Sequence, residues 1–457
     1  MTLTSRLGEH FSGLKPAQQP DAGIAEMKRL LLDYLGVALS GSQADSGRLA
    51  GDFAVEMGGV PQATVIGRAD RVPAVHAAFA NAVAQHSIEL DDVDDEALFH
   101  YGPPVISATL AVAQAVRANG ADTLGAALAG CEMTNRLSRA VNPALRDRGF
   151  HTTPTCGVFG AAVAAGRLLA LSPEQMTSAL GLAGAQASGL MEMYGTSMQK
   201  RVNPGPAARN GVTAAMLAQR GFTGADTVIE GERGFAAAFS DSFDPSQLTD
   251  GLGVEVPVTV EYKPYSCARP IHNAIDCALR LRQEHGIEPA DIEAVTVARH
   301  PAWAHYHVIN RPRTYHEAQV SLPWSVAVAF ADGAALPEQY AGRRLQDATV
   351  MSLAERVMIE TDDSLKRGVS CRMTVTTRAG AASPARAAES GPLVAEVDYP
   401  KGSTRNPMSD AELTDKFRML TAPVLPPRQA EQLAELVFAA DQVADVNQLI
   451  ELTHPPS

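Results

Sequence analysis

A mainly α-helical protein with a smaller α+β part is the fold class that this sequence predicts. The chain has 457 residues, and 46% of them are hydrophobic. A chain of this length is usually too long for one compact core. Aromatic residues make up only 5%, and long stretches consist of Ala, Gly, Leu and Val, whose small side chains let helices pack closely. No long β-alternation occurs before about residue 255. We therefore expect a helical domain over 1–255, an α+β domain over 256–400, and C-terminal helices over 401–457 that return to the helical domain.

The individual elements follow from periodicity and capping signals. Ser172-Pro-Glu-Gln175 and Ser409-Asp-Ala-Glu412 have the pattern of capping boxes, so helices should begin there. Stretches rich in Val and Thr predict strands. The helical spacing of apolar residues predicts helices over 22–40, 71–90, 104–118, 123–141, 172–186, 206–220, 270–285, 317–332, 335–355, 409–420, 426–438 and 441–452. The strands are expected at 292–298, 357–360, 370–377 and 394–399, with 254–262 either a strand or an extended segment.

Charge and cysteine content exclude several classes of protein. The net charge of −13, from 38 basic and 51 acidic residues, argues against nucleic acid or an anionic membrane as partner and leaves a small anionic substrate open. The five cysteines form no C-x-x-C motif, which argues against a disulfide framework, a thiolate zinc site and an iron–sulfur cluster. The first residues lack the apolar core of a signal peptide, so we expect a cytoplasmic protein.

Polar, titratable residues gather in four segments of otherwise apolar sequence. The first segment runs from residue 86 to 95 and is followed by His100, which precedes a helix that begins with proline. Free N–H groups at that helix start favour a substrate carboxylate. A solvated acidic loop is the alternative interpretation.

The other three segments carry basic side chains. His151 precedes a helix of small residues, Lys200 and Arg201 lie in a loop flanked by Gly and Pro, and Arg269 with His272 follows the predicted domain boundary. A partly buried lysine can act as a base, and arginine suits a bidentate grip on a carboxylate. Structural histidines and a surface pair of cations are the alternatives. Because H-E-x-x-H, G-x-S-x-G and G-x-G-x-x-G motifs are absent and the four segments show no metal-ligand pattern, proton transfer by positioned bases is the predicted chemistry.

At these segments the chain resembles the MmgE/PrpD family. The resemblance spans nearly the whole chain and is carried by "GFHTTPTCGVFGAAVAAGRLLALSPEQ", "KRVNPGPAARNG", "GFTGADTVIEGERGF", "KPYSCARPIHNAIDCAL" and "EAQVSLPWSVAVAFADG". The family includes 2-methylcitrate dehydratase, cis-aconitate decarboxylase and iminodisuccinate epimerase. The resemblance implies a homodimer with an active site between its domains and no metal or cofactor. The resemblance, taken position by position, and the four polar segments together predict the site residues. Catalytic roles are expected for Asp91, His100, His151, Lys200 and His272, and substrate binding is expected for Glu89, Asp92, Tyr194, Arg201 and Arg269.

Four positions depart from the family pattern and bear on the reaction. Glu89 replaces an Asp, Val93 a Thr, Asn203 a His and Trp324 a Tyr. Since two hydroxyl groups of the lyases are lost while the basic groups remain, we expect epimerisation of an iminodisuccinate-like amino dicarboxylate, with Lys200 exchanging the substrate proton with His151. A dehydratase or decarboxylase of a citrate- or aconitate-like acid, and a non-catalytic dimer that binds an organic acid, are the alternatives.

Overall fold

The computed structural model describes residues 1–15, 19–193, 197–303, 305–366, 370–378 and 391–456. The chain divides into two compact units. Unit 1 comprises Met1–Tyr194, Met198–Glu261 and Ser409–Ser457, and unit 2 comprises Gly195–Ser197 and Tyr262–Met408. Both units contain helices. Among the described residues, unit 1 has one short pair of strands and unit 2 has a four-stranded sheet. The predicted mainly α class with a smaller α+β part is therefore confirmed.

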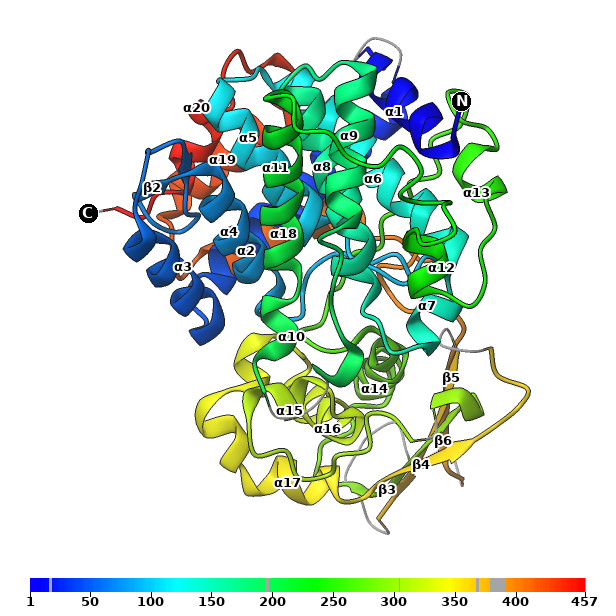
Figure 1. Ribbon diagram of the computed structural model, residues 1–457. Coiled ribbons are helices and arrows are strands. Elements are labelled where there is room, and N and C mark those ends of the chain that lie inside the picture. The colour runs from blue at the N-terminus through cyan, green and yellow to red at the C-terminus, as the bar shows by residue number, and fades with distance from the viewer. Residues whose placement is uncertain (16–18, 194–196, 304, 367–369, 379–390, 457) are drawn as a thin grey trace. The chain divides into compact units, whose positions relative to one another are not determined.

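Unit 1 is built from helices that are drawn from both ends of the chain (Figure 1). Its α-helices are α1 (Leu3–Gly13), α2 (Asp21–Gly41), α3 (Asp45–Met57), α4 (Ala74–His86), α5 (Ser107–Val116), α6 (Gly120–Val141), α7 (Ala144–Asp147), α8 (Thr152–Leu168), α9 (Pro173–Gly184), α10 (Gln199–Val202), α11 (Pro204–Gln219), α12 (Phe235–Phe239), α13 (Ser246–Thr249), α18 (Asp410–Thr421), α19 (Pro427–Phe438) and α20 (Asn447–Ile450). A π-helical turn, η2 (Gly102–Ile106), leads into α5. The strands β1 (Ala63–Thr64) and β2 (Arg71–Val72) form one small antiparallel pair.

Small residues explain how the helices of unit 1 approach one another. Helix α8 packs between α6 and α11, and its residues from Thr152 to Gly166 are all buried. A Cβ atom added at Gly130 of α6 would lie 2.6 Å from the carbonyl oxygen of Gly160 in α8, and one at Gly160 would lie 2.4 Å from the carbonyl oxygen of Gly130. Each glycine therefore makes room for the other helix, which is the close packing that the composition predicts.

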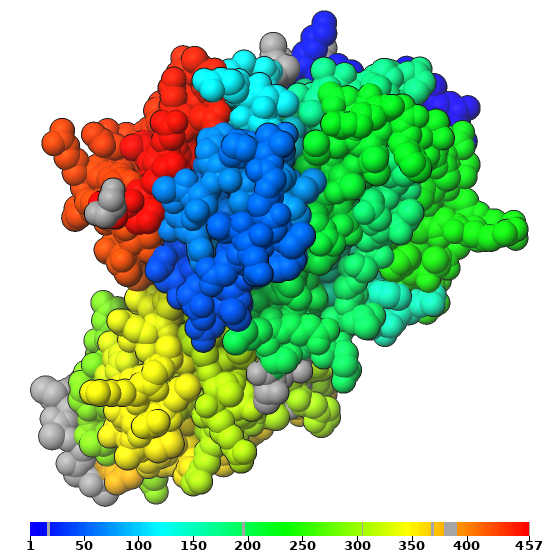
Figure 2. Space-filling view, turned by 60° about the vertical axis from the view of Figure 1, so that its left-hand side comes forward, coloured from blue at the N-terminus to red at the C-terminus, as the bar shows by residue number. Residues whose placement is uncertain are grey.

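The C-terminal helices of unit 1 pack on its N-terminal helices. Helix α18 contacts α2, and α19 contacts both α2 and α18. Figure 2 shows the red and orange C-terminal segment lying against the blue N-terminal part of this unit. Residues at the two ends of the sequence thus share one core.

Unit 2 combines a four-stranded sheet with helices. The sheet has the order β4 (Val357–Thr361), β3 (Ile292–Arg299), β5 (Cys371–Thr377), β6 (Leu393–Val397); β3 pairs parallel with β4 and antiparallel with β5, and β5 pairs antiparallel with β6. Helix α14 (His272–His285) packs on β5 and β6, and α16 (Leu322–Asp332) packs on α14 and α17 (Ala348–Ala354). A short helix, α15 (Tyr315–Gln319), precedes α16.

Most predicted elements are present, and the exceptions have local causes. Both capping boxes are confirmed, since Ser172 and Ser409 each accept from the backbone of the third helical residue. The predicted helix over 335–355 is wrong for most of its length, because 3-10 turns at 337–346 precede α17. The expected helix over 317–332 breaks before Ser321, which caps α16. Of the segment 254–262, residues 255–260 belong to no helix or strand, and Glu261 forms an isolated bridge with Val93.

A small strand pair and six helices were not predicted: α1, α3, α7, α10, α12 and α13. The last four have only four or five residues, too few to show helical periodicity. Helices α1 and α3 are longer, and each buries a face that includes Gly with Ser or Thr. The pair β1–β2 has only two residues in each strand, too few to show alternation. Across the described part of the chain, every helix is too short or too polar to cross a lipid bilayer.

Candidate active site

The first of the four polar segments follows directly after α4. His86 is the last residue of α4, and the next turn carries Glu89 in a left-handed backbone conformation with φ of 56°. The side chains of His86, Glu89, Asp91 and Asp92 are fully buried. The alternative of a solvated acidic loop is therefore wrong. Burying several ionisable groups is costly unless each one is paired, so their partners define what the segment does.

Glu89 contacts two cations from another of the polar segments, the one that contains Lys200 and Arg201. Its Oε1 accepts hydrogen bonds from Nζ of Lys200 and from Nη1 of Arg201, both on the short helix α10. Lys200 and Arg201 are buried, so they are not a surface pair. Two neighbouring cations in a setting with little water suit the binding of an anion.

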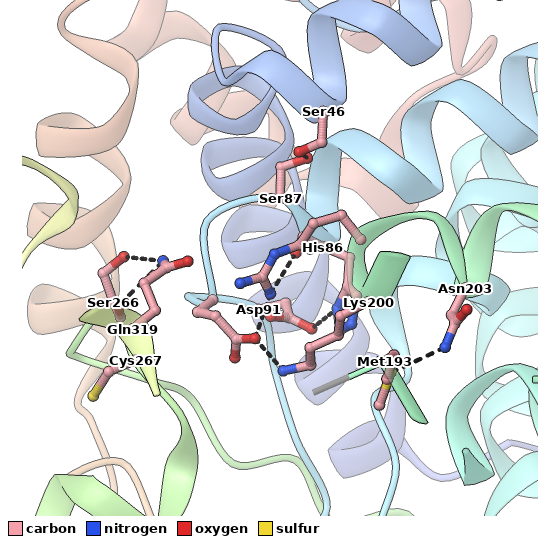
Figure 3. A network of polar contacts seen from close by, with 12 residues as sticks. Ser46, His86, Ser87, Asp91, Met193, Lys200, Asn203, Ser266, Cys267 and Gln319 are labelled. Atoms are coloured by element: carbon pink, nitrogen blue, oxygen red, sulfur yellow. Dashed lines mark hydrogen bonds and ion pairs between the residues drawn. The ribbon is translucent and has the colours of Figure 1, made fainter. Parts of the chain in front are cut away.

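Asp91 holds two imidazole rings with a single oxygen atom. Its Oδ2 lies 2.8 Å from Nδ1 of His86 and 2.8 Å from Nδ1 of His100. A carboxylate oxygen accepts, so each ring carries its proton on Nδ1 and a lone pair on Nε2. Among the described residues, Nε2 of His86 has no hydrogen-bond partner. Figure 3 shows His86, Asp91 and Lys200 gathered at the end of α4.

His151 adds a third imidazole to this group. It precedes α8, and its ring centroid lies 6.2 Å from that of His86. The side-chain amide of Asn203 donates to its Nδ1 over 3.2 Å (Figure 3 shows Asn203 beside Met193). Burial, followed by the charges of His86, His100 and Lys200, lowers the pKa of His151 well below its usual value. Burial likewise lowers the pKa of His86 to about 4 against the opposing effect of Asp91. Both rings are therefore neutral at pH 7.

Asp92 turns away from this group and caps the next helix. Its carboxylate accepts from the backbone N–H groups of Tyr101 at 2.6 Å and Gly102 at 2.9 Å. Burial and then the charge of Asp91 raise the pKa of Asp92 to about 7. The expectation that free N–H groups at this helix start bind a substrate carboxylate is wrong, because the protein's own carboxylate takes them.

A second carboxylate, Asp94, fixes the far end of the segment. Its Oδ2 accepts from the hydroxyl of Tyr101 at 2.8 Å, from the amide of Asn135 at 2.8 Å and from the hydroxyl of Thr259 at 3.1 Å. Burial raises the pKa of Asp94 in spite of these hydrogen bonds. The network ties the segment to α6, so the positions of His100 and Asp91 depend on the fold of unit 1 as a whole.

Two predicted site residues belong to unit 2, and one lies outside the described residues. Nη1 of Arg269 lies 3.3 Å from Nδ1 of His272 and donates to the carbonyl of Lys401 over 3.1 Å. Nε2 of His272 lies 3.2 Å from the carbonyl of Cys267 and donates to it. Both ring nitrogens of His272 are thus engaged within unit 2, and its role in proton transfer stays a prediction. Tyr194 lies outside the described residues.

The residues that depart from the family pattern lie in different parts of the structure. Trp324 is fully buried in the core of unit 2 and donates from Nε1 to the carbonyl of Gln339 over 3.0 Å. Val93 pairs through its backbone with Glu261, and its side chain is buried. Asn203, in contrast, contacts the ring of His151. Of the four departures, those at Glu89 and Asn203 change groups that contact proposed catalytic residues, Lys200 and His151.

His86, Asp91 and His100 are also the described group whose donor atoms could hold a metal ion, since these atoms lie within 4.8 Å of one another. Two imidazoles and a carboxylate are common ligands for transition metals. Here, however, both imidazole N–H groups donate to the carboxylate oxygen. A metal ion at Nδ1 would need both rings in the tautomer that carries its proton on Nε2. That the site works without metal stays a prediction.

Sequence reasoning missed His86 and Thr153. His86 ends a helix whose other faces are Ala-rich and buried, and a polar residue in that position is the signal that could have identified it. The hydroxyl of Thr153 accepts from the backbone N–H of His100 over 3.2 Å, a contact between residues 53 positions apart. No local pattern in the sequence predicts a contact of that length.

Comparison with known proteins identifies relatives of this chain and its family. A cis-aconitate decarboxylase-like protein of Aspergillus oryzae is 28% identical over 98% of this chain and 97% of its own length. The cis-aconitate decarboxylase of Aspergillus terreus is 26% identical over 99% of this chain and 96% of its own length. The human cis-aconitate decarboxylase is 28% identical over 100% of this chain and 95% of its own length. These relatives favour the lyase alternative over the epimerase that the sequence analysis preferred. Residues 5–248 match the MmgE/PrpD N-terminal domain and residues 265–442 match the MmgE/PrpD C-terminal domain, so the chain belongs to the MmgE/PrpD family.

Proposed function

We propose that this protein is a carboxy-lyase that removes CO2 from a small tricarboxylic acid of the cis-aconitate class. The observation that carries the proposal is the meeting of Lys200 and Arg201 on Glu89, buried and beside three imidazoles. Relatives that match nearly the whole chain are named cis-aconitate decarboxylases, which supports the same reaction class.

The chemistry needs one charged group to hold the substrate and one to deliver a proton. When the C–C bond to a carboxylate breaks, CO2 leaves and the electron pair remains on the carbon skeleton, delocalised onto a neighbouring carboxylate. One proton must then reach carbon. In our proposal, Arg201 holds a retained carboxylate and the ammonium group of Lys200 donates the proton, and the positive charge of both stabilises the carbanion before it is quenched.

The histidines serve this reaction best in their neutral form. Because the pKa of His86 and that of His151 are lowered, neither ring is protonated at pH 7, and neither replaces Lys200 as the proton donor. Their N–H groups and lone pairs orient substrate oxygens by hydrogen bonds instead. We propose this orienting role for His100 and His151, with Asp91 fixing the tautomer of His100.

Epimerisation has less support than the sequence suggested. It needs a base that removes a proton from carbon, and Lys200 was the expected base. An ammonium group that faces a carboxylate is a proton donor, whereas a base must first lose its proton. The second argument for epimerisation, the missing hydroxyl at Trp324, also fails, because that side chain is buried in the core of unit 2.

The test is turnover of a panel of acids followed by proton NMR in deuterium oxide. The purified chain is incubated with cis-aconitate, citrate, 2-methylcitrate and stereopure iminodisuccinate in the presence of EDTA. The proposal expects loss of cis-aconitate, release of CO2 and one deuterium at carbon in the product. Inversion of iminodisuccinate with deuterium uptake would support the epimerase instead. Thermal stabilisation by these acids without any turnover would support the non-catalytic binder.

A further inference from the structure

A lysine from the C-terminal helix α18 contacts the polar segment of the candidate site. Nζ of Lys416 donates to the backbone carbonyl of Leu90 over 2.7 Å and to Oδ1 of Asp33 over 2.6 Å. Lys416 and Asp33 are buried, and Leu90 is fully buried. Leu90 lies between Glu89, which binds the two cations, and Asp91, which holds the imidazoles.

The surroundings of this contact are packed tightly. Val37 of α2, Ile88 and Leu90 of the segment, and Leu420 of α18 form a small apolar cluster of their own. A Cβ atom added at Gly36 of α2 would lie 3.3 Å from Cα of Phe417 and 3.1 Å from its Cδ2. The two helices are therefore as close as a glycine allows, and the ammonium group of Lys416 has little freedom to move.

We propose that Lys416 is a positioning residue for the active site, a proposal that rests on the function proposed above. The carbonyl of Leu90 belongs to the peptide that joins Leu90 to Asp91. The orientation of that peptide determines the direction in which the Asp91 side chain points. Asp91 in turn fixes the orientation of the imidazole rings of His86 and His100. Asp33 neutralises the buried ammonium group so that it can serve this purpose.

The alternative is that Lys416 and Asp33 form only a structural ion pair. The two roles are separable because a buried ion pair can often be replaced by apolar side chains without loss of stability. The double variant Lys416→Met with Asp33→Leu removes both charges and keeps a filled core. It also removes the donor to the carbonyl of Leu90, the contact on which the positioning role depends.

The matched control is another buried ion pair of unit 1. Arg136 pairs with Glu132 at 2.8 Å and also donates to backbone carbonyls, those of Asp250 and Glu255, in a segment that carries no proposed site residue. The double variant Arg136→Met with Glu132→Leu therefore removes a buried pair and a backbone anchor of the same kind elsewhere. Both double variants are compared with wild type by thermal unfolding and by steady-state kinetics on cis-aconitate.

The proposal expects kcat of the Lys416 and Asp33 double variant to fall about tenfold or more, the range of a lost hydrogen bond from a charged group, with KM changed by less than about threefold. The control variant is expected to keep the wild-type kcat. Lys416→Arg, which retains a donor, is expected to recover part of the loss relative to Lys416→Met. Equal kcat in both double variants and wild type would overturn the proposal.

Amide hydrogen exchange separates this proposal from the function on which it rests. The proposal expects exchange of residues 88–101 to speed up about tenfold or more in the Lys416 and Asp33 double variant and not in the control. If wild type turns over none of the acids but this exchange changes, the proposed function fails and the anchoring stands. If exchange in the segment is the same as in wild type, the anchoring fails whatever the turnover.

Discussion

Glu89 shows how one buried carboxylate positions two cationic side chains. It adopts a positive φ, which is uncommon for a residue with a side chain, and points its carboxylate at Lys200 and Arg201. Backbone strain of this kind is found where function requires it. A glutamate in place of the family's aspartate reaches one methylene further. One carboxylate thereby contacts both cationic side chains, the pair that the proposed reaction uses to hold the substrate and to protonate carbon.

His86 gives a prediction about the dependence of stability on pH. Burial lowers the pKa of His86 from 6.5 to about 4 in the folded state. Between pH 4 and pH 6.5, His86 is therefore protonated in the unfolded chain and neutral in the folded chain. The free energy of unfolding should therefore fall as pH drops from 6.5 towards 4, with His86 contributing about 3 kcal/mol of that loss. His86→Asn places an amide N–H near the position of Nδ1 and does not titrate.

The measurement is urea unfolding of wild type and His86→Asn at pH 7.5 and pH 4. We expect the difference in unfolding free energy between the two pH values to be about 3 kcal/mol smaller in the variant. Histidines that do not interact with His86 contribute equally to both proteins and cancel in the comparison. An unchanged difference between the two pH values would show that His86 is not held neutral.

At the scale of elements, the start of α5 is arranged around the carboxylate of Asp92. A Cβ atom added at Gly102 in the π-helical turn η2 would lie 2.5 Å from Oδ1 of Asp92 and 2.9 Å from Nε2 of Gln85. The carboxylate is held by two backbone N–H groups and cannot retreat without losing them. Gly102 is thus required by the cap, and π-helical turns of this kind often occur near functional sites.

Gly102→Ala should therefore lower the free energy of unfolding by about 1–3 kcal/mol, the usual cost of forcing extra atoms into a packed region. It should also reduce kcat, because Asp92 would pull on the segment that carries Asp91. Gly13→Ala is the control, since a Cβ atom there meets nothing within 4 Å and alanine favours a helix. Chemical unfolding and kinetics of both variants check this, and equal stability of the two would contradict the account of the cap.

At the scale of the whole molecule, the sequence predicted the elements far better than their partners. The helical class and both capping boxes are confirmed, because apolar periodicity and caps are local properties. The short 3-10 turns at 337–346 were mistaken for helix, because Ala, Leu, Gln and Arg are common in both. Local patterns cannot separate a full helix from a series of short turns that tertiary packing holds together.

The contacts that make the site were beyond the reach of local patterns. Glu89 and Lys200 are 111 residues apart, and Lys416 and Leu90 are 326 apart. Sequence reasoning gathered Asp91, His100, His151 and Lys200 by resemblance to the family, and unit 1 contains all four. The resemblance also predicted substrate binding by Asp92. In the structure its carboxylate accepts from the backbone N–H groups of Tyr101 and Gly102, and a role toward substrate stays a prediction.

The central claim is that the ammonium group of Lys200 protonates carbon after CO2 has left. Its most direct test is the rate of CO2 release from cis-aconitate by wild type and Lys200→Met, with Lys28→Met, which breaks only a surface ion pair with Asp441, as control. We predict that wild type and Lys28→Met release CO2 equally fast and that Lys200→Met is slower by about 10²–10⁴-fold, the usual contribution of a general acid. Equal rates in all three proteins would contradict the claim.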